Sequence, residues 1–278
     1  MQPTESGLVV NTGIDYDISV REILETFHEQ GVNCASIGGQ PSHVASWWSD
    51  DALSDLVELC DSLRMTIHSI HCPIGTDHNL CSVDPQILAK TVKGMERAIR
   101  AATELGAEAV VFHAYALQDP LFQRVRTIET HLEELILLAE ALNVQFAVEN
   151  LPNEGCVGAL YAIMAVMGDR LKFCWDSGHA NLPGSGGLSL LDCLRDSLCM
   201  VHLSDNDGQT DQHLIPGMGS MDFDKIMKKL AKIGYRGCIL LETKRPRGMT
   251  LVRAVKLNLE AGRTLLSLRE GYAMGLGQ

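Results

Sequence analysis

The sequence predicts a single (β/α)8 barrel, and three observations support this prediction. Short apolar runs alternate with longer amphipathic runs along the whole chain, and eight such pairs can be traced. The links between them are short, and no linker or shift in composition divides the chain. The length of 278 residues, 46% of them hydrophobic, suits one barrel with a large core. Such alternation is typical of a parallel sheet with helical crossovers, so we expect one domain over residues 1–278.

The eight expected strands are short apolar segments bounded by polar or glycine-containing turns. They lie at residues 8–11, 34–37, 65–71, 109–113, 144–149, 171–175, 199–203 and 238–242. The segments between them space their apolar residues as amphipathic helices do, and three of these helices are closed by Gly31, Gly106 and Gly234. The expected helices lie at residues 20–30, 51–63, 85–105, 122–142, 157–167, 188–194, 223–233 and 250–268. We expect the tail, 270–278, to be loose.

The strands show which of their faces points into the barrel. Side chains alternate between the two faces of a strand, and the bulkier apolar face should meet the helices. In the strand at 144–149, the residues in phase with Glu149 are smaller or more polar than Phe146 and Val148 between them. The same test places Asp176 and Glu242 on the inner face, at or just past the ends of their strands. Three carboxylates should therefore converge inside one end of the barrel.

Charge, hydropathy and cysteine content indicate which partners and which cellular compartment to expect. The formal net charge of −12 disfavours nucleic acid as a partner, because affinity for polyanions rests largely on Lys and Arg contacts to phosphate. Bound divalent cations would add positive charge that this count omits. No apolar segment is long enough to cross a bilayer, and residues 1–13 lack the features of a secretory leader. The nine cysteines are scattered without a C-x-x-C pair, so we expect a reducing cytoplasm.

Side chains able to bind a metal ion gather at the carboxyl ends of the predicted strands, where barrel enzymes place their chemistry. A mixture of imidazole and carboxylate donors suits Zn²⁺, Mn²⁺, Fe²⁺ or Co²⁺ better than Ca²⁺. The nine groups are His71, His113, Glu149, Asp176, His179, His202, Asp211, His213 and Glu242.

Each of these groups also has a purely structural interpretation. A glutamate at a strand end often only accepts hydrogen bonds from a neighbouring loop. Asp176-x-x-His179 could cap a helix, and Asp211-x-His213 could belong to a solvated loop. The functional interpretation is favoured because all the groups fall on one rim, and because several buried carboxylates are costly without cations to compensate them.

Other polar and aromatic residues are assigned structural roles. His68 is one step out of phase with His71, so we expect it to face outward. The helices and loops that hold the remaining histidines offer no convergent partner, which predicts surface positions for His28, His43, His78 and His131. The segment with Lys244, Arg245 and Arg247 either grips a phosphate or carboxylate at the mouth or forms a solvated basic turn. For Trp47 and Trp48 we expect packing rather than sugar stacking.

At these residues the chain resembles the xylose-isomerase-like barrel superfamily, which contains sugar isomerases and epimerases as well as endonuclease IV. The resemblance is strongest in FAVENLP, FCWDSGHANL, VHLSDNDGQTDQHLIPGMGSMDF and ILLET. For the ketose epimerase branch it implies one divalent ion held by Glu149, Asp176, His202 and Glu242, with both glutamates also acting as acid and base. It further implies that His179 orients a substrate hydroxyl. The arginine that epimerases carry a few residues beyond the strand-seven histidine is absent, since residues 207–209 are Asp-Gly-Gln.

For endonuclease IV the resemblance implies three zinc ions, because residues of the required type stand at all nine ligand positions. The rim loops lack the Lys, Arg and aromatic residues that a DNA-wedging surface needs. After His71 come Cys72, Pro73 and Ile74, where an aromatic wedge would be expected. The resemblance therefore favours a sugar substrate over nucleic acid.

The resulting hypothesis is a divalent-metal-dependent isomerase or epimerase of a small sugar or sugar phosphate, working through an enediolate. The expected cofactor is Mn²⁺, Zn²⁺ or Co²⁺, in one or more sites, and a homo-oligomer is left open. Glu149 and Glu242 are the expected acid and base. The other five candidate residues either line the substrate pocket or hold additional metal. They are His71, His113, His179, Asp211 and His213. The alternatives are a zinc phosphodiesterase of the endonuclease IV type and a barrel that binds sugar or metal without turnover.

Overall fold

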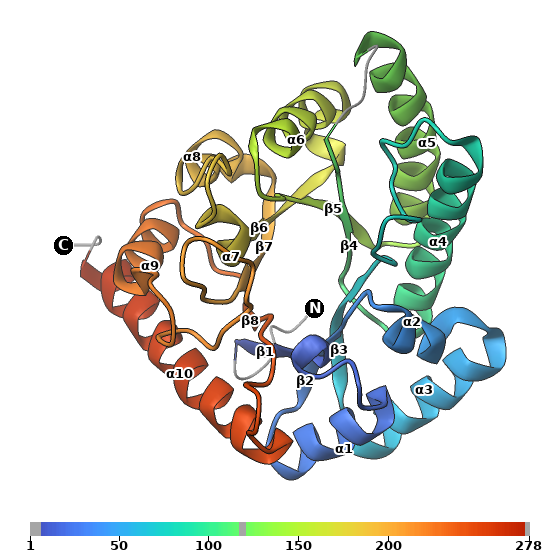
Figure 1. The fold of residues 1–278 in the computed structure, drawn as a ribbon. Coiled ribbons are helices and arrows are strands. Elements are labelled where there is room, and N and C mark those ends of the chain that lie inside the picture. The colour runs from blue at the N-terminus through green and yellow to red at the C-terminus, as the bar shows by residue number, and fades with distance from the viewer. Residues whose placement is uncertain (1–6, 117–120, 276–278) are drawn as a thin grey trace.

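Eight parallel strands form a closed barrel in the order β1 to β8 (Figure 1), as seen in the computed structural model, which describes residues 7–116 and 121–275. Each strand pairs in parallel with its neighbours in the sequence, and β8 closes the ring against β1. The strands are β1 (Leu8–Asn11), β2 (Cys34–Ile37), β3 (Thr66–His71), β4 (Ala109–His113), β5 (Gln145–Glu149), β6 (Lys172–Asp176), β7 (Leu198–Leu203) and β8 (Ile239–Leu241). The predicted barrel is confirmed.

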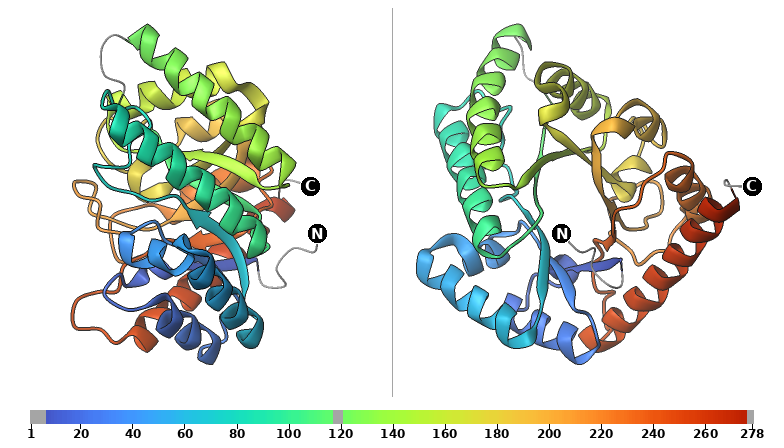
Figure 2. Two further views of the ribbon diagram at one scale, coloured as in Figure 1. Left: turned by 90° about the vertical axis from the view of Figure 1, so that its right-hand side faces the viewer. Right: turned by 180° about the vertical axis from the view of Figure 1, so that it is seen from behind.

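Helices surround the barrel on its outside (Figure 2). They are α1 (Val20–Glu29), α2 (Pro41–Trp48), α3 (Asp50–Leu63), α4 (Pro85–Glu104), α5 (Leu121–Ala141), α6 (Glu154–Met167), α7 (Ser177–Ala180), α8 (Ser189–Cys193), α9 (Phe223–Lys232) and α10 (Leu251–Gly275). The sequence did not predict the short helices α2 and α7. Among the described residues, none of these helices is both long enough and apolar enough to span a membrane.

The end of α10 differs from the expectation of a loose tail, because the helix continues to Gly275. Two contacts hold its last turns against the barrel. The Arg269 guanidinium donates to the carbonyl of Gly237 and lies 5.8 Å from the centre of the Tyr235 ring. The Tyr272 hydroxyl donates to the Asp224 carboxylate on α9. Only residues 276–278 of the predicted loose segment fall outside the described chain.

The core has two layers, as the alternation of side chains predicted. Large residues such as Phe146 and Trp175 pack between the barrel and its helices. Smaller residues such as Ala147 and Cys174 fill the barrel interior, where little room is left between eight strands. This arrangement leaves the inward-facing strand ends free for polar groups.

Strand β3 contains an irregularity that the sequence did not reveal. Ala35 pairs with Ile67, but the next residue, Ser36, pairs with Ser69, so β3 has one extra residue at His68. The His68 ring is buried, and its Nδ1 lies 3.3 Å from the Ser69 hydroxyl on the inner side. The prediction that His68 faces outward was wrong because a bulge shifts the alternation by one residue.

His43 was also placed wrongly, because the sequence did not reveal the helix that carries it. It lies on α2 and is completely buried instead of lying at the surface. Its Nδ1 lies 2.9 Å from the Thr12 hydroxyl. The ring therefore ties α2 to the loop after β1.

Candidate metal centre

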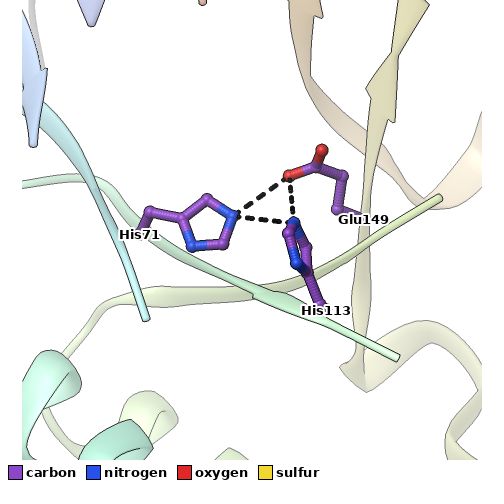
Figure 3. A group of neighbouring side chains, drawn as sticks. All are labelled: His71, His113 and Glu149. Carbon is purple, nitrogen blue, oxygen red and sulfur yellow. Dashed lines mark hydrogen bonds and ion pairs between the residues drawn. The ribbon is translucent and has the colours of Figure 1, made fainter. Parts of the chain in front are cut away.

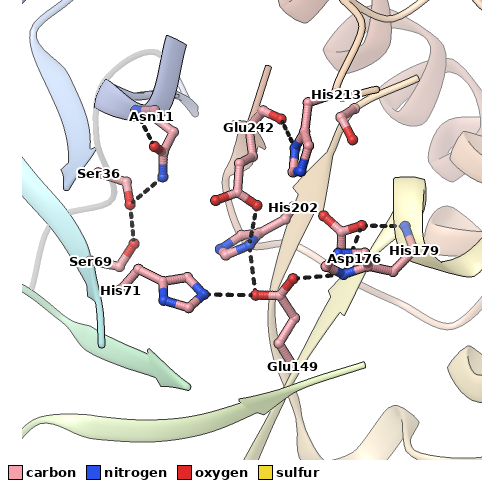
Figure 4. A network of polar contacts seen from close by, with 12 residues as sticks. Asn11, Ser36, Ser69, His71, Glu149, Asp176, His179, His202, His213 and Glu242 are labelled. Atoms are coloured by element: carbon pink, nitrogen blue, oxygen red, sulfur yellow. Dashed lines mark hydrogen bonds and ion pairs between the residues drawn. The ribbon is translucent and has the colours of Figure 1, made fainter. Parts of the chain in front are cut away.

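Four side chains converge at the carboxyl ends of β5 to β8 (Figure 4). Glu149 and Asp176 are the last residues of β5 and β6, His202 is near the end of β7, and Glu242 directly follows β8. Parallel pairing places His202 beside Asp176, and closure of the barrel brings Glu242 to the same point. One ligand atom from each lies within 4.8 Å of the others. The structure thus brings together the four residues predicted to hold the metal ion.

These four residues, Glu149, Asp176, His202 and Glu242, form the tetrad. The contacts within it centre on the imidazole of His202. Its Nδ1 lies 3.2 Å from Glu149 Oε2 and 3.0 Å from Glu242 Oε2. Glu149, Asp176 and His202 are almost completely buried. Asp176 Oδ2 and His202 Nε2 have no hydrogen-bond partner. Buried polar atoms normally have partners, so this donor set fits a divalent cation that would satisfy them.

A second donor group, formed by His71, His113 and Glu149, shares the Oε2 atom of Glu149 with His202 (Figure 3). His71 Nε2 lies 3.2 Å from His113 Nε2 and 3.3 Å from Glu149 Oε2. His71 Nδ1 lies 2.8 Å from the Cys72 carbonyl oxygen, to which it can only donate. That bond leaves Nε2 of His71 with its lone pair facing the group, which is the form in which an imidazole binds a metal ion.

A third group, His179, Asp211 and His213, lies toward the mouth. Asp211 Oδ2 lies 3.1 Å from His213 Nε2 and 3.5 Å from His179 Nε2. His213 Nδ1 lies 3.0 Å from the Glu242 carbonyl, to which it can only donate, so Nε2 is the nitrogen that faces Asp211. The groups are connected, because His179 Nδ1 lies 3.1 Å from Glu149 Oε1.

Local structure explains how the chain holds His179 and the Asp211 loop. Asp176 Oδ1 accepts a hydrogen bond of 2.6 Å from the amide of His179, so the cap that was considered as an alternative exists beside the donor role. The loop after β7 is tied back by an antiparallel bridge between Asp205 and Leu214. The Asp205 carboxylate also accepts from the amides of Gly217 and Gly219, which fixes the path of the loop.

The carboxylates of the tetrad have unequal pKa values. Burial raises the pKa of Asp176 to about 7, and Glu149 and Glu242 add to this rise against the opposing charge of His179. Burial would also raise the pKa of Glu242, but the charge and hydrogen bond of His202 bring it to about 2. For Glu149, the charge of His202 and hydrogen bonds from surrounding histidines outweigh burial and hold the pKa well below its usual value. The ionised glutamates are therefore balanced by the positive charge of buried histidines such as His202, a role that a bound divalent cation would also fill.

A cavity of about 160 Å³ opens above these groups. Both predicted acid–base residues, Glu149 and Glu242, line it, as do all five residues predicted to line a substrate pocket or hold further metal. Lys244 is also in the wall, whereas Arg245 turns away and pairs with Asp15. Only Lys244 of the predicted basic segment is thus available to a ligand in this cavity.

Tyr16 also lines the cavity, and sequence reasoning missed it. A β-carbon added at Gly13 or Gly38 would lie 2.5 Å or 2.8 Å from the Tyr16 hydroxyl, so both positions require glycine to seat the ring. Burial and the charges of Glu242 and Glu149 raise the pKa of Tyr16. Glycines within two residues of the ends of two predicted strands were the one sequence signal for a close approach here.

A sequence profile of the xylose isomerase-like TIM barrel family matches residues 19–269. The chain belongs to this family. It is 31% identical over 201 residues to an uncharacterized protein of Methanocaldococcus jannaschii, with 68% of each chain covered. It is 27% identical over 215 residues to fructoselysine 3-epimerase of Shigella flexneri, covering 74% of this chain and 78% of the relative. A crystal structure of a D-tagatose 3-epimerase-like protein matches with a TM-score of 0.79 and 24% identity, covering 97% and 99% of the two chains.

Proposed function

We propose that this protein is a divalent-metal-dependent epimerase or isomerase of a small sugar or sugar derivative. The observation that carries the proposal is the pair of buried carboxylates, Glu149 and Glu242, which contact the same His202 nitrogen and line one cavity. Such a pair can remove a proton from a substrate carbon and return one to it. Membership of a family with a fructoselysine 3-epimerase among its relatives supports the assignment to sugar chemistry.

The tetrad would hold the ion through Glu149, Asp176, His202 and Glu242. A divalent ion bound there supplies a Lewis acid for the carbonyl and adjacent hydroxyl of a ketose, which lowers the cost of the enediolate. The low pKa values keep Glu149 and Glu242 ionised, so either can accept the proton from the carbon next to the carbonyl. The first glutamate then releases its proton to solvent, and the opposite glutamate takes up a proton from solvent and delivers it to the substrate. Delivery to the same carbon gives epimerisation, and delivery to the neighbouring carbon gives isomerisation.

The remaining groups of the cavity orient the substrate. His179 and His213 would offer ring nitrogens to sugar hydroxyls, and Tyr16 lines the same cavity. The Lys244 ammonium at the mouth would bind a phosphate or a terminal hydroxyl. Since the groups around Glu149 and Asp211 also have the composition of cation sites, they would hold further ions where these are available.

Mutation of Glu149 tests this proposal. We expect metal-loaded wild type to exchange the carbon-bound proton of a ketose with solvent deuterium, detected by NMR over a panel of ketoses. Glu149→Gln should lose turnover while its circular dichroism stays native. Glu58→Gln is the matched control, because Glu58 is exposed on α3 away from the cavity. Turnover near the wild-type level in Glu149→Gln would exclude Glu149 as the base.

A zinc phosphodiesterase is the second candidate, and one observation favours it. Three donor groups surround one cavity, and Glu149 contributes to those containing His71 and His202. Such an arrangement can hold ions close enough to act together on a phosphodiester. Metal analysis after zinc loading, combined with cleavage of DNA containing an abasic site, distinguishes the candidates. About three ions per chain with cleavage would support the phosphodiesterase, and ketose exchange without cleavage would support the epimerase.

A further inference from the structure

A second and larger cavity lies beside the metal centre. Its volume is about 410 Å³, against about 160 Å³ for the cavity above the tetrad. It lies between helix α2 and the loop that follows β3, with Lys90 of α4 at its edge. Small-molecule sites commonly have a volume of this size. The chemistry proposed above uses none of this space.

The two cavities share two wall residues. Gly39 and Ile74 belong to the walls of both. The amide of Ile74 donates a hydrogen bond of 3.0 Å to the carbonyl of Gly39, so the boundary is held by backbone. A β-carbon at Gly39 would lie 2.3 Å from the Cys72 carbonyl and 2.8 Å from His71 Nδ1, so no larger residue fits there. Gly39 and Ile74 therefore form the wall between the cavity at the metal centre and the larger cavity.

The wall of the larger cavity is mainly apolar. Pro41, Val44 and Trp48 come from α2, and Pro73 and Ile74 come from the loop after β3. Trp48 is 38% exposed, although its neighbour Trp47 is completely buried. Binding to an apolar wall of this kind is favourable only when the ligand covers it with apolar surface, because the burial of apolar surface releases water.

The charged groups at the edge leave the cavity close to neutral. The carboxylate of Asp77 and the ammonium of Lys90 form an ion pair, so their charges cancel. Burial, with the charge of Lys90, lowers the pKa of His78, which keeps that ring neutral. This balance disfavours a phosphate, whose charge would need an unpaired cation.

We propose that this cavity binds an uncharged apolar substituent, such as an aryl group, of a sugar whose polar part lies at the metal centre. This inference rests on the proposed function and deepens it, because it makes the substrate a substituted sugar. A free sugar carries a hydroxyl on nearly every carbon and would leave the wall around Trp48 uncovered. A sugar with an aryl group would use both cavities across the Gly39–Ile74 boundary.

Binding of two ketoses to the manganese-loaded protein tests the inference. The probes are D-fructose and 1-anilino-1-deoxy-D-fructose, which adds a phenyl group while keeping the carbonyl and the neighbouring carbon-bound proton. Calorimetry should show about 30-fold tighter binding of the anilino compound, the size expected for burying a phenyl ring. Ala45→Trp should abolish this preference, because Ala45 is an exposed residue of α2 whose replacement fills the cavity.

The control is Ser54→Trp, at an exposed position of α3 outside both cavities, which should retain the full preference. Equal binding of the two ketoses by wild type, or an undiminished preference in Ala45→Trp, would overturn the inference. Deuterium exchange into the ketoses is measured in parallel and tests the proposed function separately. Selective binding without exchange would refute the epimerase while supporting the cavity, and exchange without selectivity would do the opposite.

Discussion

The Glu242→Gln variant would separate the two proton transfers of the proposed reaction. Glu242 Oε2 lies 3.0 Å from His202 Nδ1, and Glu149 Oε2 lies 3.2 Å from the same nitrogen. If each carboxylate serves one face of the substrate carbon, loss of Glu242 leaves Glu149 able to act on the epimer whose proton faces it. That epimer should still exchange with solvent deuterium, while its conversion to the other epimer is lost.

The expected magnitude follows from the role of Glu242 as acid and base. A positioned general acid or base contributes about 10² to 10⁴ in rate, so we expect epimer interconversion to fall about 1,000-fold. Glutamine keeps the shape of the side chain and one oxygen donor. Because Glu242 is also a proposed ligand, the assay compares only protein saturated with manganese, with metal content measured on the same samples.

The assay follows deuterium incorporation and epimer interconversion by NMR, starting from each epimer in turn. Retained exchange from one epimer with loss of interconversion supports two-sided acid–base chemistry. The reasoning is refuted if metal-saturated Glu242→Gln interconverts the epimers within tenfold of wild type. It is also refuted if exchange is lost equally from both epimers, because Glu149 would then not act alone on either face.

Three further predictions concern the ion, the bulged histidine and the missed tyrosine. Free manganese or zinc at about 1,000 times its Kd should raise the free energy of unfolding by about 4 kcal/mol, and Asp176→Asn should reduce this gain in thermal unfolding. Burial, with the charge of His202, lowers the pKa of His68 to about 4. Below about pH 6.5 this histidine binds a proton in the unfolded chain, whereas the native ring stays neutral until about pH 4. The free energy of unfolding therefore falls as the pH is lowered from 6.5 to 4. From pH 7 to pH 5 the loss is about 2 kcal/mol, and denaturant unfolding of His68→Gln should lack it. Tyr16→Phe should lower kcat/KM about tenfold, the value of one hydrogen bond to substrate, with unchanged metal content; an unaltered kcat/KM would show that the hydroxyl does not contact the substrate.

Much of the fold and of the donor set could be predicted because both depend on patterns local to each strand. Alternation with a period of two residues identified the inner face of β5 and β6, and the structure places Ala147 and Cys174 in the barrel interior as expected. Closure of a parallel barrel brings all strand ends to one rim, so residues such as Glu149 and Glu242 had to meet there. Their catalytic roles stay predictions.

The failures came where the pattern alone does not set the position of a side chain. A bulge in β3 turned His68 inward, and no residue type in that strand announces it. The cap at Asp176 was predicted only as an alternative to ligation, whereas the structure shows that one oxygen caps α7 and the other has no partner. A side chain with two oxygen atoms can serve both purposes.

The sequence by itself determined the barrel, the inner faces of its strands and the chemical nature of the rim, because these follow from periodicity and from the residues at strand ends. Only the tertiary structure decided which donor atoms share Glu149, how Tyr16 enters the cavity and that an apolar cavity adjoins the metal centre. These features arise from contacts between segments far apart in the chain, such as Gly39 and Ile74. The distances across such contacts depend on how the loops pack on the barrel, which no local pattern encodes.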